Sequence, residues 1–235
     1  MQKNGKGFIE MNIGKWIQNN KEVTLYLTYE KNKPLIIFNT YVGDGKSIID
    51  KMTKTECSEF NLLVVGNLIW NHDMTPWHCP PLSKNDTPCT GGADDFLSLL
   101  TNDIIPNAKE KINGEPKFIG ISGYSLAGLF AVYTIYNTDV FDRVASISGS
   151  LWYPEFIKYC TSHEIKKLPD RMYFSLGDKE ANTRNAILKT VQENTENLSE
   201  YYKSLKIEVT YELNPGNHFR DEDIRIIKGI KAILK

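Results

Sequence analysis

Ser125 stands in a sequence setting that could make its hydroxyl reactive. In FIGISGYSLAGLFAVY (118–133) it lies between a run of strand-forming residues and a helix-like stretch rich in Leu, Ala and Phe. A sharp strand-to-helix turn forces such a serine into a sparsely allowed backbone conformation, and Gly123 and Ala127 are small enough to permit one. Its hydroxyl would stand at a helix N-terminus, where N–H groups favour a developing oxyanion. The alternative is a serine that only caps the helix, but the strand–serine–helix order favours a nucleophile.

A serine hydroxyl attacks well only when a base takes its proton, and His218 is the best placed of the four histidines to do so. It lies in NPGNHF, between the last predicted strand and the last predicted helix. His163 is typical of a surface helix. His72 and His78 follow an earlier strand, where they could touch a substrate but are poorly placed to act as the base.

The base needs an acidic partner that fixes its tautomer and stabilises its cation. Asp178 and Glu180 both follow the predicted strand RMYFSLG (171–177) and compete for this role. We favour Glu180, because its greater distance from the strand gives the loop room to turn inward, and Asp178 remains the alternative. The order serine, acid, histidine along the chain is the order of α/β-hydrolases.

An oxyanion hole in this architecture takes one N–H from the residue after the nucleophile and one from the loop after the third strand. Here these are the N–H of Leu126 and that of Tyr41 or Val42 in NTYVGDG (39–45). A backbone donor needs no particular side chain, so this prediction depends on position alone.

Alternating strands and helices must bring these residues together. The apolar patterns predict strands at 8–14, 22–30, 34–40, 60–67, 117–122, 143–149, 171–177 and 206–213. Helices are predicted at 46–52, 94–112, 126–137, 185–205 and 221–235. The fold class is therefore α/β: one domain over 1–235 with a mostly parallel sheet of about eight strands, an antiparallel first pair, helices on both faces and no separate cap domain. In such sheets ligands bind beyond the carboxyl ends of the strands.

A long segment after the fourth strand, NLIWNHDMTPWHCPPLSKNDTPCTGG (67–92), is rich in Trp, His and Pro. Loops of this length in compact domains are often functional. We expect an aromatic, partly polar substrate wall there, completed by two residues that follow a later strand. Its candidates are Trp70, His72, Asp73, Trp77, Trp152 and Tyr153. The alternative is a loop that buries its own aromatic side chains.

The net charge of −1 gives no reason to expect a nucleic acid or an anionic membrane as partner. The N-terminal residues lack a signal-peptide core and no stretch is long enough to span a bilayer, so we expect a cytoplasmic protein. The four cysteines form no C-x-x-C pair, so we expect no metal site and no cofactor. A disulfide between Cys79 and Cys89 is conceivable, but free thiols are favoured.

The chain resembles the esterase D-like group of α/β-hydrolases, and within it the branch that includes the enterobactin (trilactone siderophore) esterases. The most specific matches are GYSLAGLFAVY and VFDRVASISGSLWYPEF, completed by SLGDKE and NPGNHF, and they cover roughly residues 34–220. The family usually has Gly where Ala127 stands. The resemblance implies an α/β-hydrolase fold and hydrolysis of esters by a serine.

We therefore predict a serine carboxylic-ester hydrolase that forms an acyl-enzyme on a small-molecule ester, with a bulky or siderophore-type ester favoured over a lipid. Acyl transfer or peptide cleavage on the same residues is an alternative, and a non-catalytic binding protein on this scaffold is a weaker one. The sequence leaves the natural ester and the oligomeric state open.

Overall fold

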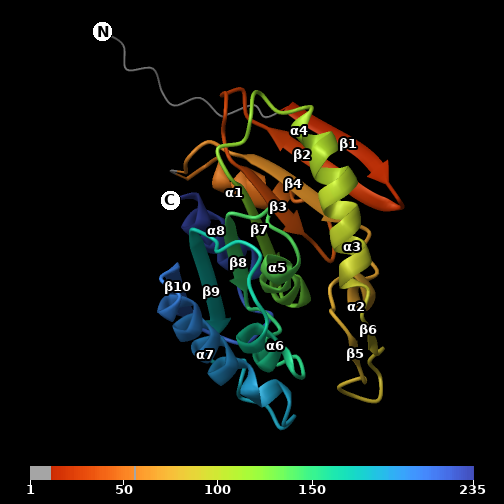
Figure 1. The fold of residues 1–235 in the computed structure, drawn as a ribbon, viewed down its shortest axis with the longest axis vertical. Coiled ribbons are helices and arrows are strands. Elements are labelled where there is room, and N and C mark those ends of the chain that lie inside the picture. Colours follow the sequence, from red (N-terminus) through yellow and green to blue (C-terminus); the bar gives the residue numbers. More distant parts are fainter. Residues whose placement is uncertain (1–11, 56) are drawn as a thin grey trace.

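Eight strands form one twisted sheet at the centre of the protein (Figure 1). The computed structural model describes residues 12–55 and 57–235. The strands lie in the order β1-β2-β4-β3-β7-β8-β9-β10, and every neighbouring pair from β4 to β10 is parallel. Their bounds are β1 Asn12–Gln18, β2 Lys21–Leu27, β3 Leu35–Asn39, β4 Asn61–Gly66, β7 Ile119–Tyr124, β8 Arg143–Ile147, β9 Arg171–Gly177 and β10 Glu208–Asn214. The predicted fold class is confirmed.

The first two strands are an antiparallel hairpin, as their alternating sequence predicts. Asn19 and Asn20 both have positive φ, at 49° and 63°, which is the requirement of a type I′ turn between twisted strands. β2 then pairs antiparallel with β4, which joins the hairpin to the parallel part of the sheet. Residues 8–11 of the predicted first strand lie outside the described residues.

Helices cover both faces of the sheet, because alternate residues of the strands are apolar on each side (Figure 1). One face packs against α1 (Lys46–Met52) and α8 (Glu222–Leu234). The other face packs against α3 (Ala93–Leu99), α4 (Ile105–Lys109), α5 (Leu126–Asn137), α6 (Phe156–Ser162) and α7 (Val191–Ser204). A 3₁₀ turn, Leu188–Thr190, precedes α7.

The helical run predicted at 94–112 is interrupted. A π-helical turn, Leu100–Ile104, separates α3 from α4, and Pro106 stands in the first turn of α4. Proline has no N–H to donate to the preceding turn, which favours such an adjustment. The π-helical turn still buries apolar side chains, since Leu100 and Ile104 are both fully buried.

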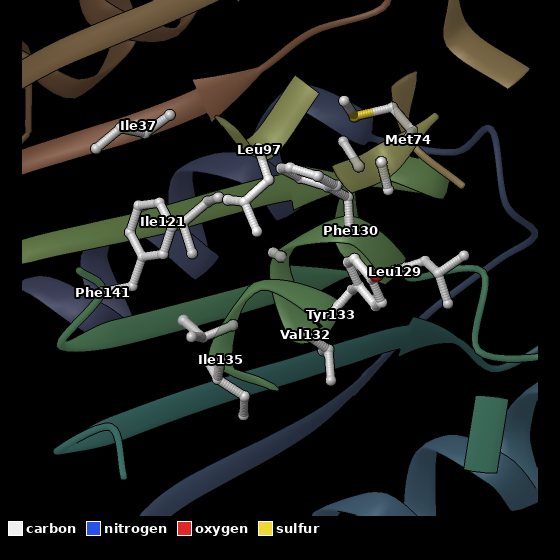
Figure 2. Close-up of a cluster of buried hydrophobic side chains, with 14 of the residues drawn as sticks. Ile37, Met74, Leu97, Ile121, Leu129, Phe130, Val132, Tyr133, Ile135 and Phe141 are labelled. Carbon is white, nitrogen blue, oxygen red and sulfur yellow. The ribbon is translucent and has the colours of Figure 1, made fainter. Parts of the chain in front are cut away.

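The helix α5 lies deepest in the core. All of its residues except Asn137 are buried, and Figure 2 shows Leu129, Phe130 and Ile135 on this helix in a cluster with Ile37 and Ile121 of the sheet. Burial on this scale fixes the helix firmly against β7. The residue that joins β7 to α5 is therefore held on both sides by rigid elements.

Candidate active site

Ser125 forms the corner between β7 and α5. Its backbone has φ 59° and ψ −122°, a conformation that a residue other than glycine adopts only when its surroundings hold it there. The N–H of Ser125 donates to the carbonyl of Ile147 at 3.1 Å. Gly123 allows the corner to be tight, because a Cβ at that position would lie 2.3 Å from the carbonyl group of Ala127. The corner has the geometry that the sequence predicted.

His218 lies between Ser125 and Glu180, and its ring contacts both. Its Nε2 is 3.1 Å from Oγ of Ser125, and its Nδ1 is 2.7 Å from Oε2 of Glu180. The backbone carbonyl of His218 accepts a hydrogen bond from the hydroxyl of Tyr124. One hydrogen-bonded series thus joins residues that follow β7, β9 and β10.

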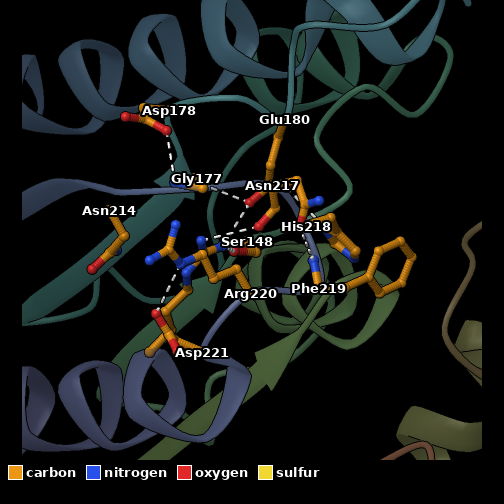
Figure 3. Close-up of polar contacts among 12 residues, drawn as sticks. Ser148, Gly177, Asp178, Glu180, Asn214, Asn217, His218, Phe219, Arg220 and Asp221 are labelled. Atoms are coloured by element: carbon orange, nitrogen blue, oxygen red, sulfur yellow. Dashed lines mark hydrogen bonds and ion pairs between the residues drawn. The ribbon is translucent and has the colours of Figure 1, made fainter.

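Of the two competing acids, Glu180 is the one that reaches the imidazole (Figure 3). Its other oxygen, Oε1, accepts the N–H of Gly177 at 2.7 Å. Asp178 turns away, and its Oδ1 accepts the N–H of Gly216 at 2.7 Å. Asp178 therefore shapes the turn before His218 without touching the ring.

The Glu180 side chain is only 4% exposed. Burial by itself would raise the pKa of this carboxyl group. The hydrogen bond and charge of His218, together with the N–H of Gly177, outweigh burial, and the pKa of Glu180 is lowered from its ordinary value. The carboxylate consequently stays ionised next to the imidazole.

Of the predicted oxyanion donors, Leu126 follows Ser125 directly, and Tyr41 and Val42 line the same cleft as Ser125. Leu126 is the first residue of α5, where an N–H has no acceptor within the helix. Tyr41 and Val42 lie in the exposed loop after β3, which the Thr40 hydroxyl shapes by donating to the Val42 carbonyl at 2.8 Å. Across residues 12–55 and 57–235, no backbone carbonyl accepts the N–H of Tyr41 or of Val42.

Ser125 and His218 line a cleft of about 1060 Å³. Trp70 and Tyr41 form one of its walls, with their rings edge to face and their centroids 5.3 Å apart. The exposed apolar side chains around this cleft are Tyr41, Val42, Ile69 and Phe219. Trp70 thus occupies the position that the sequence analysis gave it.

The other side chains predicted for the substrate wall do not line this cleft. His72 bonds through Nδ1 to the Thr90 hydroxyl at 2.7 Å and packs on Gly92. Asp73 is buried and forms an ion pair with Lys21, at 2.5 Å between Nζ and Oδ2. These two polar residues therefore contribute to holding the segment in place, through Thr90 and Lys21, and do not line the cleft.

Of the remaining aromatic residues of the predicted wall, Tyr153 lies in the core, and Trp77 and Trp152 are partly buried and pack against it. Trp77 donates from Nε1 to the carbonyl of Pro154 at 3.0 Å, and the hydroxyl of Tyr153 donates back to the Trp77 carbonyl. Tyr153 is 1% exposed, and the ring of Trp152 packs 5.8 Å from it. Trp77, the residue among these that belongs to the loop, is partly buried, in line with the alternative of a loop that packs its own aromatic side chains inward.

The segment after β4 also contains structure that the sequence did not predict. It holds the short helix α2 (Trp70–Asp73) and a two-stranded ladder of β5 (His78–Cys79) and β6 (Cys89–Thr90). Cys79 and Cys89 face each other across this ladder as free thiols, and burial raises the pKa of both.

In the described part of the chain, no group of three or more His, Cys, Asp or Glu side chains could hold a metal ion. The same residues include no helix with the length and hydropathy needed to cross a bilayer.

Sequence reasoning missed Arg225, which contacts Glu180 from α8 at 3.0 Å. A signal was available in the predicted closing helix. Arg225 stands four residues before Gly229 and next to Ile226, and all three belong to the buried face of α8. A cation on an apolar helix face needs a buried partner.

Comparison with known proteins shows what the fold and the sequence of this chain are similar to. The α/β-hydrolase fold is shared with an IroE-like serine hydrolase from Shewanella oneidensis, at TM-score 0.75 and 16% identity over 94% of this chain and 79% of that one. Siderophore hydrolase EstB from Aspergillus nidulans matches at TM-score 0.71 and 16% identity, over 93% of each chain. In sequence, the chain is 29% identical to Uncharacterized protein YbbA of Bacillus subtilis (strain 168), over 80% of this chain and 78% of that protein.

The model of the esterase family, described as "Putative esterase", matches residues 56–222. The chain belongs to this family and is a hydrolase of ester bonds. The resemblance that the motifs predicted is therefore confirmed.

Proposed function

We propose that the protein hydrolyses carboxylic esters through a Ser125–His218–Glu180 triad and an acyl-enzyme. The observation that carries the proposal is the hydrogen-bonded series from Glu180 through His218 to Ser125 at the cleft. A nucleophile, a base and an orienting carboxylate in series are the arrangement that activates a serine hydroxyl.

In this mechanism Oγ of Ser125 attacks the ester carbonyl while Nε2 of His218 takes its proton. The N–H of Leu126 and that of Tyr41 or Val42 hold the oxyanion of the tetrahedral intermediate. The imidazolium gives its proton to the leaving alcohol, and the acyl group remains on Ser125. Water then attacks the acyl-enzyme, with His218 as base again, and releases the carboxylic acid and the free serine.

The cleft supports a small-molecule ester with a bulky group. Its space of about 1060 Å³ and its apolar rim give room and contact area beyond the reacting carbonyl. Trp70 and Tyr41 would pack against that group. The name of one similar structure, siderophore hydrolase EstB, points to siderophore-type esters, which belong in the first substrate panel together with aryl and acetylated-sugar esters.

The direct test is hydrolysis of p-nitrophenyl acetate by wild type and by Ser125→Ala. We expect the variant to lose at least about a thousandfold in kcat. A fluorophosphonate probe should label wild type but not Ser125→Ala. Ser150→Ala is the matched control, because its Oγ lies 3.4 Å from that of Ser125, and it should keep the label. Equal hydrolysis by wild type and Ser125→Ala would rule out the triad.

A further inference from the structure

Arg225 is the largest fully buried side chain of the described residues, at 1% exposure. It stands in the first turn of α8, and its guanidinium lies under the loops that follow β9 and β10. A buried cation is costly unless its charge is balanced and its N–H groups are bonded. The hydrogen-bond partners of this guanidinium therefore indicate its role in the structure.

On one side the guanidinium holds the acid of the proposed triad. Its NH1 donates to Oε1 of Glu180 at 3.0 Å and to Oγ of Ser148 at 3.1 Å. Because Oε1 is taken by Arg225 and by the N–H of Gly177, Oε2 is left to face the Nδ1 of His218. The carboxylate thus has one orientation.

On the other side the same guanidinium holds the loop that carries the base. Its NH2 donates to the carbonyl of Pro215 at 3.1 Å and to that of Asn217 at 3.0 Å. These carbonyls lie on either side of Gly216, whose φ of 103° allows a tight turn just before His218. Gly177 permits the close packing, since a Cβ there would lie 2.9 Å from NH2 of Arg225.

We propose that Arg225 is a positioning residue for ester hydrolysis: it fixes Glu180 and the His218 loop, residues 215–221, relative to each other, and its charge offsets that of Glu180 at the imidazole. The inference rests on the proposed function. The two loops also meet at Gly216, whose carbonyl accepts the N–H of Lys179 at 3.1 Å and whose N–H donates to Asp178 at 2.7 Å. Arg225 is nevertheless the one described side chain that donates both to the Glu180 carboxylate and to the carbonyls beside His218, so its loss should loosen the acid relative to the base.

The charge has a consequence with a definite sign. The carboxylate of Glu180 attracts positive charge at the ring, and the cation on its far oxygen opposes this attraction. Removing the cation leaves the carboxylate unopposed, so we expect the acid limb of kcat/KM to move to higher pH in a variant without it. The other charged or titratable groups near the ring and its cleft are Tyr124 on β7, Asp178 after β9, Glu222 and Asp223 on α8, and Tyr41, Asp44, Lys46 and Asp86 across the cleft.

The test compares Arg225→Met, Arg225→Lys and wild type by kcat, KM and the pH profile of kcat/KM for p-nitrophenyl acetate. For Arg225→Met we expect kcat to fall by about tenfold to a hundredfold with KM within about threefold, since misplacement of the base affects the chemical step. The acid limb should move to higher pH by roughly half a unit to one unit. Arg225→Lys keeps the charge but cannot donate to both loops as NH1 and NH2 of the guanidinium do. Its kcat should therefore fall, while the acid limb of its kcat/KM profile should stay at the wild-type pH.

Arg171→Met is the matched control. Arg171 also bonds a carboxylate, Glu208 at 2.7 Å, and a carbonyl of α8, that of Ala232 at 3.2 Å, but it lies at the opposite edge of the sheet. It should lose thermal stability and keep the wild-type kcat and acid limb.

A folded Arg225→Met with the kcat and pH profile of wild type would overturn the inference. So would equal losses of kcat in Arg225→Met and Arg171→Met with unmoved acid limbs, because Arg225 would then only anchor α8. If Arg225→Met does not fold, the test depends on Arg225→Lys. A wild-type kcat in Arg225→Lys would overturn the inference. If wild type shows no turnover that depends on Ser125, the proposed function itself is contradicted, which is a different outcome from failure of this inference.

Discussion

The two sides of the cleft are built by different physical means. On one side the His218 loop is held by charges and backbone carbonyls, with Arg225 at its centre. On the other side the β4–α3 segment, residues 67–92, is held by packed aromatic rings and by the buried Lys21–Asp73 ion pair. The first arrangement fixes the direction of individual polar atoms, whereas the second fixes a surface. We infer that chemistry depends on the first side and substrate fit on the second.

The largest expected effect comes from separating the two acids on the catalytic side. Glu180→Gln should lower kcat by about a thousandfold or more, because the amide cannot stabilise the imidazolium or fix its tautomer. Asp178→Asn should lower it by less than about tenfold, since Asp178 only accepts the N–H of Gly216. Steady-state hydrolysis of p-nitrophenyl acetate measures both. Equal losses would contradict the assignment of Glu180 as the acid.

On the other side of the cleft, the largest effect should be on stability. Asp73→Ala leaves Lys21 buried without its partner and should lower the free energy of unfolding by about 3–5 kcal/mol. Urea unfolding measures the change. The double variant Lys21→Met with Asp73→Leu removes both charges and should recover most of the loss. If Asp73→Ala unfolds like wild type but binds substrate poorly, Asp73 belongs to the substrate wall after all.

Two tryptophans of the same segment should separate fit from stability. Trp77→Ala should cost about 3 kcal/mol of unfolding free energy, because its partly buried ring packs against the core and its Nε1 bonds to Pro154. Trp70→Ala should change stability by less than about 1 kcal/mol but raise KM for a bulky aryl ester about fivefold. Thermal unfolding and KM measured on both variants give the comparison. A reversed pattern would show that the cleft wall is assigned to the wrong residues.

The smallest effect concerns pH. The folded pKa of Glu180 is lowered, because the hydrogen bonds and charge around the carboxylate outweigh its burial. Its contribution to stability is therefore fully present above the ordinary carboxyl pKa of 4.5 and is lost as the pH falls through the lowered folded value. The advantage of wild type over Glu180→Gln in unfolding free energy should shrink on acidification in that window. An advantage that grows there would contradict the sign.

Sequence reasoning succeeded where topology fixes position. Ser125, Glu180 and His218 each follow a strand of the parallel part of the sheet, and parallel strands bring their carboxyl ends to one edge. Glu180 was preferred over Asp178 for its reach, and the structure pairs it with the imidazole.

The β4–α3 segment could not be predicted in the same way. The sequence around an aromatic residue such as Trp77 does not distinguish a side chain that faces a ligand from one that packs on the core. Tertiary packing determines which of the two it does. The partner of Asp73 is Lys21, which stands 52 positions away on β2. Arg225 was missed for a different reason: its helix was predicted, but the polar cluster that its buried face meets comes from loops far apart in sequence.

The order of elements along the chain has a consequence for biosynthesis. The nucleophile corner at Ser125 emerges from the ribosome well before the base at His218, and α8 with Arg225 is the last described element to be translated. On the proposed mechanism, a growing polypeptide holds Ser125 without its base until the His218 loop has been made. A chain that stops before this loop should therefore not cleave esters through Ser125.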